Sequence, residues 1–288
     1  MVYVVMDLEW NSVYGPKIRG YLNEIIEIGA VMLDVQYREL SHFSVLLRSR
    51  LSGGRLQTHV REMTNISRRE LERGLTYDQA ISAFRRWLGH EEHVICTWGD
   101  GDIRVMLANA RYFTGGRGLN YVQRYLDLQA YFQQKLQTSR AQQVGLAAAG
   151  EMLGLNIEDY PFHRALGDSR FAADILRKLS QDADFLGFAK DCTPDFYAEL
   201  EYKPRLISDI NNPLVDPAKL YYICRPCGRP AKQLTEWRFA SRGFQALFRC
   251  EHCGQLVKAN VAFKKLYSAV EIRRSAKVLE EGEGQTEG

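Results

Sequence analysis

Proline clustering divides this 288-residue chain more sharply than any other feature of its sequence. Proline has no backbone N–H to donate and breaks helices and central strands, so one continuous sheet or helical layer cannot pass through a proline cluster. We therefore expect a first domain at 1–185, a Pro-rich linker at 186–219, a small second domain at 220–272 and a disordered acidic tail at 273–288. Six of the eight prolines lie within 37 residues, at Pro194, Pro204, Pro213, Pro217, Pro226 and Pro230.

The charge changes sign along the chain, although the net charge is only +3. Residues 1–199 carry 23 basic and 25 acidic side chains, residues 200–277 carry 15 and 6, and residues 278–288 carry 0 and 4. The strongly basic second part favours an anionic partner such as nucleic acid. The hydrophobic content of 45% is that of a globular protein and excludes a mainly disordered chain.

No run of about 18 apolar residues occurs, so we expect neither a membrane-spanning helix nor a membrane partner. The apolar stretch Val2–Met6 is followed at once by Asp7 and Glu9 and has no basic segment before it, which is unlike a signal peptide. We therefore expect a cytoplasmic protein. In that reducing compartment, cysteines serve as free thiols or metal ligands more often than as disulfides.

Strand and helix patterns alternate through residues 1–185. Runs rich in β-branched and aromatic residues predict strands at Val2–Leu8, Ile25–Leu33, His42–Leu47 and His93–Thr97. Apolar residues three and four apart predict helices at about 77–88, 102–113, 144–153 and 165–179. This pattern is typical of an α/β domain, whose ligands bind where parallel strands end.

Acidic side chains follow two of the predicted strands. Asp7 and Glu9 are two residues apart at the end of the first strand and therefore point to the same side, where two like charges favour a bound cation such as Mg²⁺ or Mn²⁺. Asp100 and Asp102 follow the strand at 93–97. We expect Asp100 to cap the next helix and Asp102 to be the metal ligand.

His163 and Asp168 form a third polar group around the start of the helix at 165–179. Alone, each group also fits ordinary solvent-exposed side chains, and Asp100 is the alternative to Asp102 as a ligand. Taken together in this order, the groups resemble the three motifs of the DEDDh 3′-to-5′ exonucleases, a DnaQ-like family with an RNase H-like fold. The matching positions are Asp7-x-Glu9, Asp102 and His163-x4-Asp168.

The resemblance covers about residues 1–185 and extends beyond the acids. Residues 23–31 (NEIIEIGAV) are similar to the family's second strand, and residues 62–66 (EMTNI) are similar to its substrate loop. Residues 97–102 (TWGDGD) resemble the branch of RNA-trimming and sporulation-inhibitor-type exonucleases. Trp10-Asn11 and Ser169 depart from the family pattern, but none of them is a metal ligand or a base. The implied fold is an RNase H-like mixed sheet flanked by helices.

The resemblance also implies an activity, namely metal-dependent 3′-to-5′ hydrolysis of nucleic acid with a free 3′ end, RNA favoured over DNA, to 5′ mononucleotides. Two Mg²⁺ or Mn²⁺ ions would activate water and stabilise the leaving 3′ oxygen, with His163 as general base. The alternative is a catalytically idle nucleic-acid-binding or adaptor protein that keeps the fold. The expected metal ligands are Asp7, Glu9, Asp102 and Asp168, and the expected substrate contacts are Leu8, Trp10, Met63 and Thr64.

Four of the six cysteines form two C-x2-C-G pairs separated by 22 residues. This spacing is typical of a zinc ribbon with one structural Zn²⁺, whereas a thioredoxin-like redox pair needs only one such motif. Cys96 and Cys192 are expected to be buried thiols outside the site. The predicted zinc ligands are Cys224, Cys227, Cys250 and Cys253.

Basic and aromatic residues are interleaved between the two cysteine pairs. Such a segment can contact phosphates with its cations and stack bases on its rings. Alternatively, the rings form the core of the ribbon, which we expect for most of Phe239, Phe244 and Phe248, or the ribbon binds a protein partner. The interleaved residues are Lys232, Trp237, Arg238, Phe239, Arg242, Phe244, Phe248 and Arg249.

Overall fold

The computed structural model describes residues 1–15, 18, 20–116, 118–138, 143–160, 163–179 and 185–279. The chain forms two compact units, Met1–Tyr197 and Ala198–Gly288, and each is described by itself. Within the described residues, no helix is long and apolar enough to cross a membrane.

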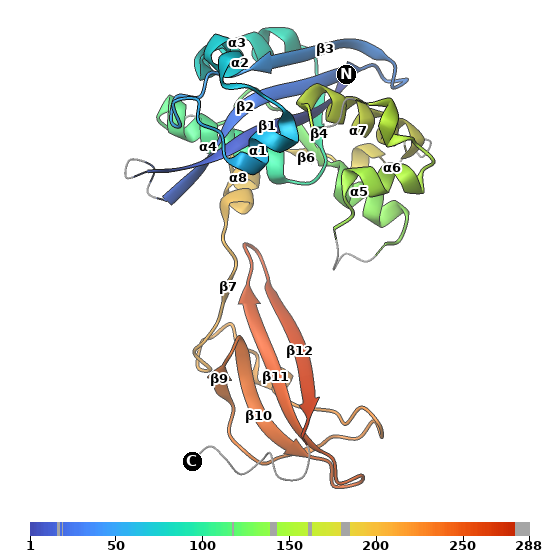
Figure 1. Cartoon of the computed structure of the whole chain (residues 1–288). Coiled ribbons are helices and arrows are strands. Elements are labelled where there is room, and N and C mark those ends of the chain that lie inside the picture. The colour runs from blue at the N-terminus through green and yellow to red at the C-terminus, as the bar shows by residue number, and fades with distance from the viewer. Residues whose placement is uncertain are drawn as a thin grey trace. The chain divides into compact units, whose positions relative to one another are not determined.

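The first unit is built on a mixed six-stranded sheet with the order β3-β2-β1-β4-β5-β6 (Figure 1). β1, β2 and β3 are antiparallel, β4 and β5 run parallel to β1, and β6 is antiparallel to β5. The strands are β1 (Val2–Gly15), β2 (Gly20–Leu33), β3 (Glu39–Leu46), β4 (His93–Thr97), β5 (Arg124–Asp127) and β6 (Lys190–Asp191).

Helices flank this sheet, which confirms the predicted RNase H-like mixed architecture. The four helices expected from apolar periodicity are present as α3, α4, α6 and α7, whereas α1, α2, α5 and α8 were not predicted. The helices are α1 (Thr58–Thr64), α2 (Arg68–Arg73), α3 (Tyr77–Leu88), α4 (Gly101–Thr114), α5 (Leu128–Lys135), α6 (Leu146–Met152), α7 (Ala165–Leu179) and α8 (Pro194–Glu201), with short 3₁₀ turns η1 (Ile157–Asp159) and η2 (Phe185–Phe188).

Alternation along β1 decides which side chains face α7. Tyr3 and Val5 are buried in a core cluster with Phe171, Ile175 and other α7 residues. Since successive strand residues point to opposite faces, the next two odd-numbered positions on β1 continue toward the same helix. Those positions are Asp7 and Glu9.

β1 is longer than the sequence predicted. The strand was expected to end near Leu8, but it continues to Gly15 because the β1–β2 hairpin keeps pairing from Trp10 to Gly15 after a bulge at Glu9/Trp10. The parallel partner β4 pairs only with Val2–Val5. Asp7 and Glu9 therefore lie just beyond the carboxyl end of the parallel pairing, rather than at the end of the strand.

α7 approaches β2 unusually closely at Gly29. A Cβ atom at this position would lie 2.1 Å from backbone atoms of Ala165 and Leu166, so only glycine fits. The Ser169 hydroxyl is 3.0 Å from the Gly29 carbonyl oxygen and 2.6 Å from that of Ala165. Ser169, a departure from the family pattern, thus helps to attach the first turns of α7 to the sheet.

The second unit is an antiparallel sheet with the order β12-β11-β10-β8, in which β7 also pairs with β11 and β9 with β10. Two apolar clusters cover one side of it, with Phe244 and Phe263 in one and Phe248 in the other. The elements are β7 (Arg205–Leu206), η3 (Pro217–Lys219), β8 (Lys232–Gln233), β9 (Arg238–Ala240), β10 (Gly243–Arg249), β11 (Leu256–Lys265) and β12 (Val270–Val278).

Two predicted boundaries need correction. The segment expected to be a Pro-rich linker holds β6, α8, β7 and η3, because Pro194 and Pro217 occupy first helical positions, where the missing N–H costs nothing. The acidic tail was expected to begin at residue 273, but β12 continues to Val278 because it pairs with β11 along its whole length. The rest of the predicted tail, 280–288, lies outside the described residues.

Substituting Gly29 with alanine should destabilise the first unit by about 1–3 kcal/mol, because the added methyl group would collide with the backbone of α7. Gly145→Ala is the matched control, since no atom lies within 4 Å of a Cβ there and its φ is −64°. Chemical denaturation of both variants measures the effect. Equal stability of Gly29→Ala and the unmodified chain would show that α7 does not rest on Gly29.

Candidate active site

The structure brings Asp7, Glu9 and Asp168 together. Asp7 and Glu9 come from β1, and Asp168 comes from the first turn of α7, where burial of the helix's apolar stripe holds it against the sheet. One carboxylate oxygen of each lies within 4.8 Å of the others. Carboxylate oxygens at this separation suit a hard divalent cation.

Asp102 lies beside this cluster at the start of α4. It is buried, and one of its carboxylate oxygens accepts a hydrogen bond of 3.0 Å from the backbone N–H of Leu8. Asp100 occupies the N-cap position of α4 but makes no capping hydrogen bond with its side chain, contrary to expectation. Its exposed carboxylate instead pairs with Arg104 one turn later. Of these two aspartates, therefore, only Asp102 is buried next to β1.

The four acids shift one another's ionisation. Burial, and then the charges of Asp102, Asp168 and Glu9, raise the pKa of Asp7 well above its usual range. Burial, followed by repulsion from Asp168, raises the pKa of Glu9 to about 8. Burial raises the pKa of Asp102 to about 7 and that of Asp168 to about 6, the latter against the nearby positive His163. Such a cluster is fully ionised at neutral pH only with a cation to offset the repulsion.

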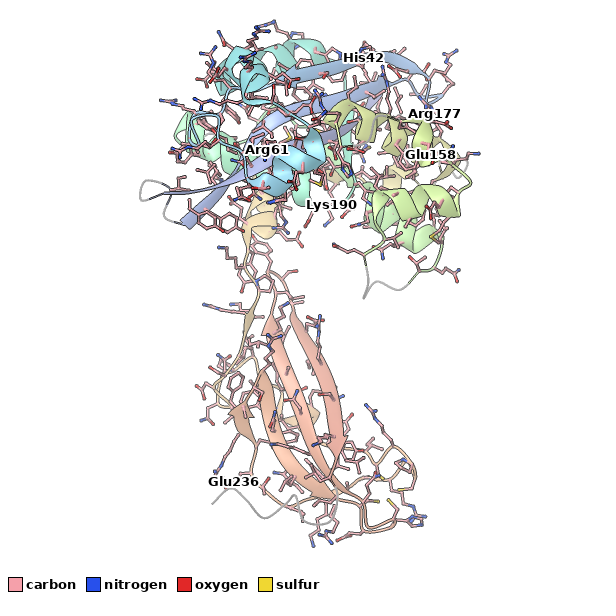
Figure 2. All side chains as sticks on the ribbon, in the orientation of Figure 1. His42, Arg61, Glu158, Arg177, Lys190 and Glu236 are labelled. Carbon is pink, nitrogen blue, oxygen red and sulfur yellow. The ribbon has the colours of Figure 1, made fainter. Side chains whose placement is uncertain are left out.

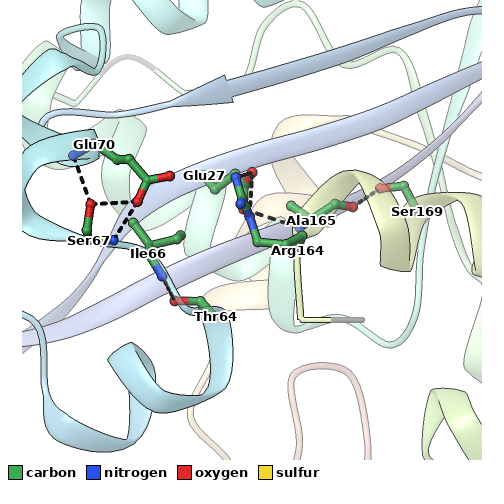
Figure 3. A network of polar contacts seen from close by, with 8 residues as sticks. All are labelled: Glu27, Thr64, Ile66, Ser67, Glu70, Arg164, Ala165 and Ser169. Atoms are coloured by element: carbon green, nitrogen blue, oxygen red, sulfur yellow. Dashed lines mark hydrogen bonds and ion pairs between the residues drawn. The ribbon is translucent and has the colours of Figure 1, made fainter. Parts of the chain in front are cut away.

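His163 precedes α7 in a left-handed backbone conformation with φ of 60°, which is uncommon for a residue with a side chain. The next residue, Arg164, is fixed by a two-pronged ion pair with the buried Glu27 of β2, at 3.0 Å (Nε to Oε2) and 2.8 Å (Nη2 to Oε1) (Figure 3). A Glu27 oxygen is also 3.4 Å from the N–H of Ala165. Glu27 thus attaches the segment carrying His163 to the sheet.

An open pocket of about 710 Å³ exposes this cluster. α1 forms one wall of the pocket, and α6 and η1, which contains Glu158, form another. In Figure 2 the labels Arg61 and Glu158 mark α1 and η1. None of the described residues that line the pocket is a lysine or arginine. The lining residues are Asp7, Leu8, Glu9, Trp10, His59, Val60, Met63, Leu146, Ala147, Glu158, Tyr160, His163 and Asp168.

Three of the four expected substrate contacts line this pocket. Leu8 is buried, and its backbone N–H donates a hydrogen bond to Asp102. Met63, on α1, is 47% exposed. Trp10 lines the pocket as well. The prediction for Thr64 does not fit, because its buried hydroxyl donates to the Val60 carbonyl within α1.

Several pocket residues were not foreseen from the sequence, among them His59, Glu158 and Tyr160. They come from helices or turns without a catalytic spacing, so no local signal marks them. Glu27 was also missed, because the pairing that places it directly opposite Glu9 in the β1–β2 hairpin is visible only in the structure. Glu27 adds a second carboxylate next to Glu9, and the guanidinium of Arg164 offsets its negative charge in an ion pair.

The second unit holds the four predicted cysteines in one cluster. Their sulfur atoms all lie within 4.8 Å of one another, with Cys224–Cys253 at 3.5 Å and Cys227–Cys250 at 3.4 Å. Gly228 and Gly254, each following a pair, have φ of 67° and 73°, which glycine alone adopts freely. The backbone N–H groups of Cys253 and His252 lower the pKa of Cys250 to about 6. Cys96 and Cys192 lie outside the cluster.

Comparisons with known proteins agree with this geometry. The chain is similar in fold to a 3′-exonuclease solved in a study of 3′-end-specific recognition of a histone mRNA stem-loop, with TM-score 0.56 and 18% identity over 67% of this chain and 71% of that chain. It is also similar to the nuclease domain of 3′hExo, a DEDDh family member bound to rAMP, with TM-score 0.56 and 19% identity over 63% and 92% of the two chains.

A third similar structure is cell-death related nuclease 4, with TM-score 0.52 and 17% identity over 70% of this chain and 72% of that chain. No curated protein sequence matches the chain. A family model described as Exonuclease (RNase_T) matches residues 4–176, a range that contains every acid of the cluster and His163. The chain therefore belongs to the Exonuclease (RNase_T) family.

Proposed function

We propose that this protein is a metal-dependent 3′-to-5′ exonuclease that releases 5′ mononucleotides, with RNA as the favoured substrate. The observation that carries the proposal is the carboxylate cluster of Asp7, Glu9 and Asp168 with Asp102 beside it, open to a pocket that His163 also lines. An idle binding protein would have no need to crowd four acids whose burial, together with nearby carboxylate charge, raises their pKa values.

The acids fit a pair of divalent ions better than they fit water. Bound there, Mg²⁺ or Mn²⁺ would activate the attacking water and stabilise the leaving 3′ oxygen. Asp7, Glu9 and Asp168 would hold the ions, with Asp102 as the fourth ligand, oriented by the hydrogen bond that it accepts from the Leu8 N–H. The described lining of the pocket has several acids and no arginine or lysine, so it repels a phosphodiester and the ions would also be needed for substrate binding.

His163 is suited to take the proton from the attacking water. An imidazole ring nitrogen can accept a proton and release it again, as a general base requires. The Glu27–Arg164 ion pair holds its backbone in place. Trp10 and the exposed Met63 offer flat or flexible apolar surface for the terminal bases.

The cysteine cluster is proposed to bind one structural Zn²⁺. Four sulfurs within 4.8 Å match tetrahedral thiolate coordination, and a closed set of four protein ligands leaves no position for substrate. The metal would hold together the two turns at 224–228 and 250–254, which carry the four sulfurs. The second unit would thereby be stabilised without a role in the chemical step.

Asp102→Asn should lower the rate of Mg²⁺-dependent 3′-to-5′ hydrolysis at least about 100-fold, the order expected on removing one charged group from a transition-state site. Asp100→Asn is the control, since Asp100 is exposed and pairs only with Arg104. Stepwise shortening of matched 5′-labelled RNA and DNA strands would measure the rates and show which is preferred. Similar loss in both variants, or in neither, would contradict the assigned ligand.

Without divalent metal, the first unit should lose stability as the pH rises from about 5 to about 8. The folded state keeps protons on Glu9 and Asp102, with pKa values of about 8 and about 7, whereas the unfolded chain releases them near 4.5 and 3.8. Because the folded state binds more protons over this range, rising pH favours unfolding.

Thermal unfolding at pH 5.5 and 8.0, with and without Mn²⁺, tests this linkage. Mn²⁺ should raise the melting temperature by several degrees at pH 8.0 and much less at pH 5.5. Asp7→Asn should show a smaller decline with pH in metal-free buffer, since it removes one of the repelling charges. A melting temperature independent of pH and Mn²⁺ would argue against a metal site at the acids.

One zinc ion should co-purify with each chain, and Cys227→Ser should reduce the zinc content by at least half and lower the melting temperature of the second unit. Cys192→Ser is the control, because Cys192 is a free thiol outside the cluster. Elemental analysis by mass spectrometry gives the stoichiometry. Equal zinc content in Cys227→Ser and the unmodified chain would refute the site.

A further inference from the structure

The strands of the second unit separate rings from cations. Cations and rings alternate in the sequence between the cysteine pairs, and alternate strand residues point to opposite faces. Phe244 and Phe248 of β10 face the covered side, where they contact Phe239 and Trp237 with ring centroids at 5.6 and 5.5 Å. Arg249, the residue after Phe248 on β10, and Arg238, the residue before Phe239 on β9, therefore point to the other side of the sheet.

Register extends this assignment across the sheet, because residues directly opposite on antiparallel strands share a face. Arg249 of β10 pairs with Lys232 of β8. Leu247, two residues earlier on β10 and therefore on the same face, pairs with Lys258 of β11. Lys258 in turn pairs with Lys277 of β12. We call this side the basic face; its charged residues are Lys232, Arg238, Arg249, Lys258, Lys264, Arg273 and Lys277, with Glu271 as the acid.

The basic face is open to solvent. All of its cations are exposed except the half-buried Lys264, whereas the apolar clusters lie on the opposite side. Lys232 has a distant partner in Glu251 at 3.5 Å, and Arg273 pairs with Glu271 at 2.7 Å. Arg238, Arg249 and Lys258 have no carboxylate partner among the described residues. Within the part of the unit that the structure describes, the charges of these three residues are therefore uncompensated.

The uncharged residues of the basic face are small or aliphatic, and none is aromatic. They are Leu206, Ala240, Gly243, Gln245, Leu247, Leu256, Asn260, Ala262 and Ser275. Surfaces that bind single strands combine cations with rings on which unpaired bases stack. A flat cationic face without rings instead suits a polyanion whose bases are already stacked inside a helix.

We propose that the basic face binds the phosphate backbone of double-helical nucleic acid, independently of base sequence. Six residues separate Lys258 from Lys264 along β11, which is about 20 Å at about 3.3 Å per residue. A duplex carries one charge per about 1.7 Å of its axis with both strands counted, so this length of duplex carries about a dozen phosphates, and those on one side of it can face the sheet. The choice of partner rests on the proposed nuclease function, whose pocket has no arginine or lysine among its described lining residues to hold a substrate backbone.

The test measures binding of the zinc-loaded full chain to an RNA dumbbell, a duplex closed by loops at both ends. The dumbbell has no 3′ end, so the pocket of the first unit is not engaged. Affinity is measured by fluorescence anisotropy from 50 to 300 mM salt. The triple variant Arg238→Gln, Arg249→Gln, Lys258→Gln should bind at least about tenfold more weakly, and the slope of log affinity against log salt should fall by about 2–3.

The matched control is Lys203→Gln, Lys219→Gln, Arg229→Gln, which removes the same charge from exposed positions of the second unit that lie outside the basic face. It should retain at least three quarters of the salt slope. Equal losses of affinity in the two triple variants would show that binding depends only on net charge, and this would overturn the proposal. A single strand of the same length that competes as well as the dumbbell would also overturn it, as would an unchanged slope.

Hydrolysis of a labelled single strand by the unmodified chain is measured alongside. If the chain binds the dumbbell through the basic face but releases no nucleotides, the proposed activity fails while this inference stands. If it hydrolyses the strand and the basic-face variant keeps its salt slope, the inference alone fails.

Discussion

Repulsion among buried carboxylates is the constraint on which the first unit depends. Asp7, Glu9, Asp102 and Asp168 come from three different elements and raise one another's pKa values, so electrostatics alone would drive those elements apart. Packing opposes this force. α7 rests on β2 where Gly29 leaves no room for a side chain, and a core of aromatic and aliphatic residues holds the same helix against β1. The site is therefore stabilised by its surroundings rather than by its own contacts.

The sequence predicted the elements that carry this packing because their signals are local. Apolar periodicity in α3 and α7 and the β-branched runs of β1 and β2 come from burial on one face, which any buried element must show. The order of the acids identified the family that the comparisons support. Asp102 was preferred to Asp100 on weak grounds, and the reason for the difference, a hydrogen bond from Leu8 across 94 residues, is visible only in three dimensions.

What the sequence could not predict depends on contacts between distant segments. Thr64 belongs to a stretch similar to the family's substrate loop, yet α1 turns its hydroxyl back onto Val60. The length of β1 is set by its partner β2 and not by its own composition, which becomes polar after Leu8. In the sequence, Glu27 is one more polar residue in a strand, whereas in the structure its ion pair with Arg164 fixes the segment that carries His163. Each of these misses is a pairing that propensity does not encode.

In the second unit, the alternation of strand faces decides what the interleaved cations and aromatic rings can bind. In one dimension, the segment resembles a surface that could both contact phosphates and stack bases. In a strand with period two, the same residues cannot do both on one face, because the rings are used to build the core. The cations left on the basic face can recognise charge but not bases. The acidic pocket, which we propose to depend on metal, and the basic face without rings are therefore complementary, since each lacks the chemistry that the other provides.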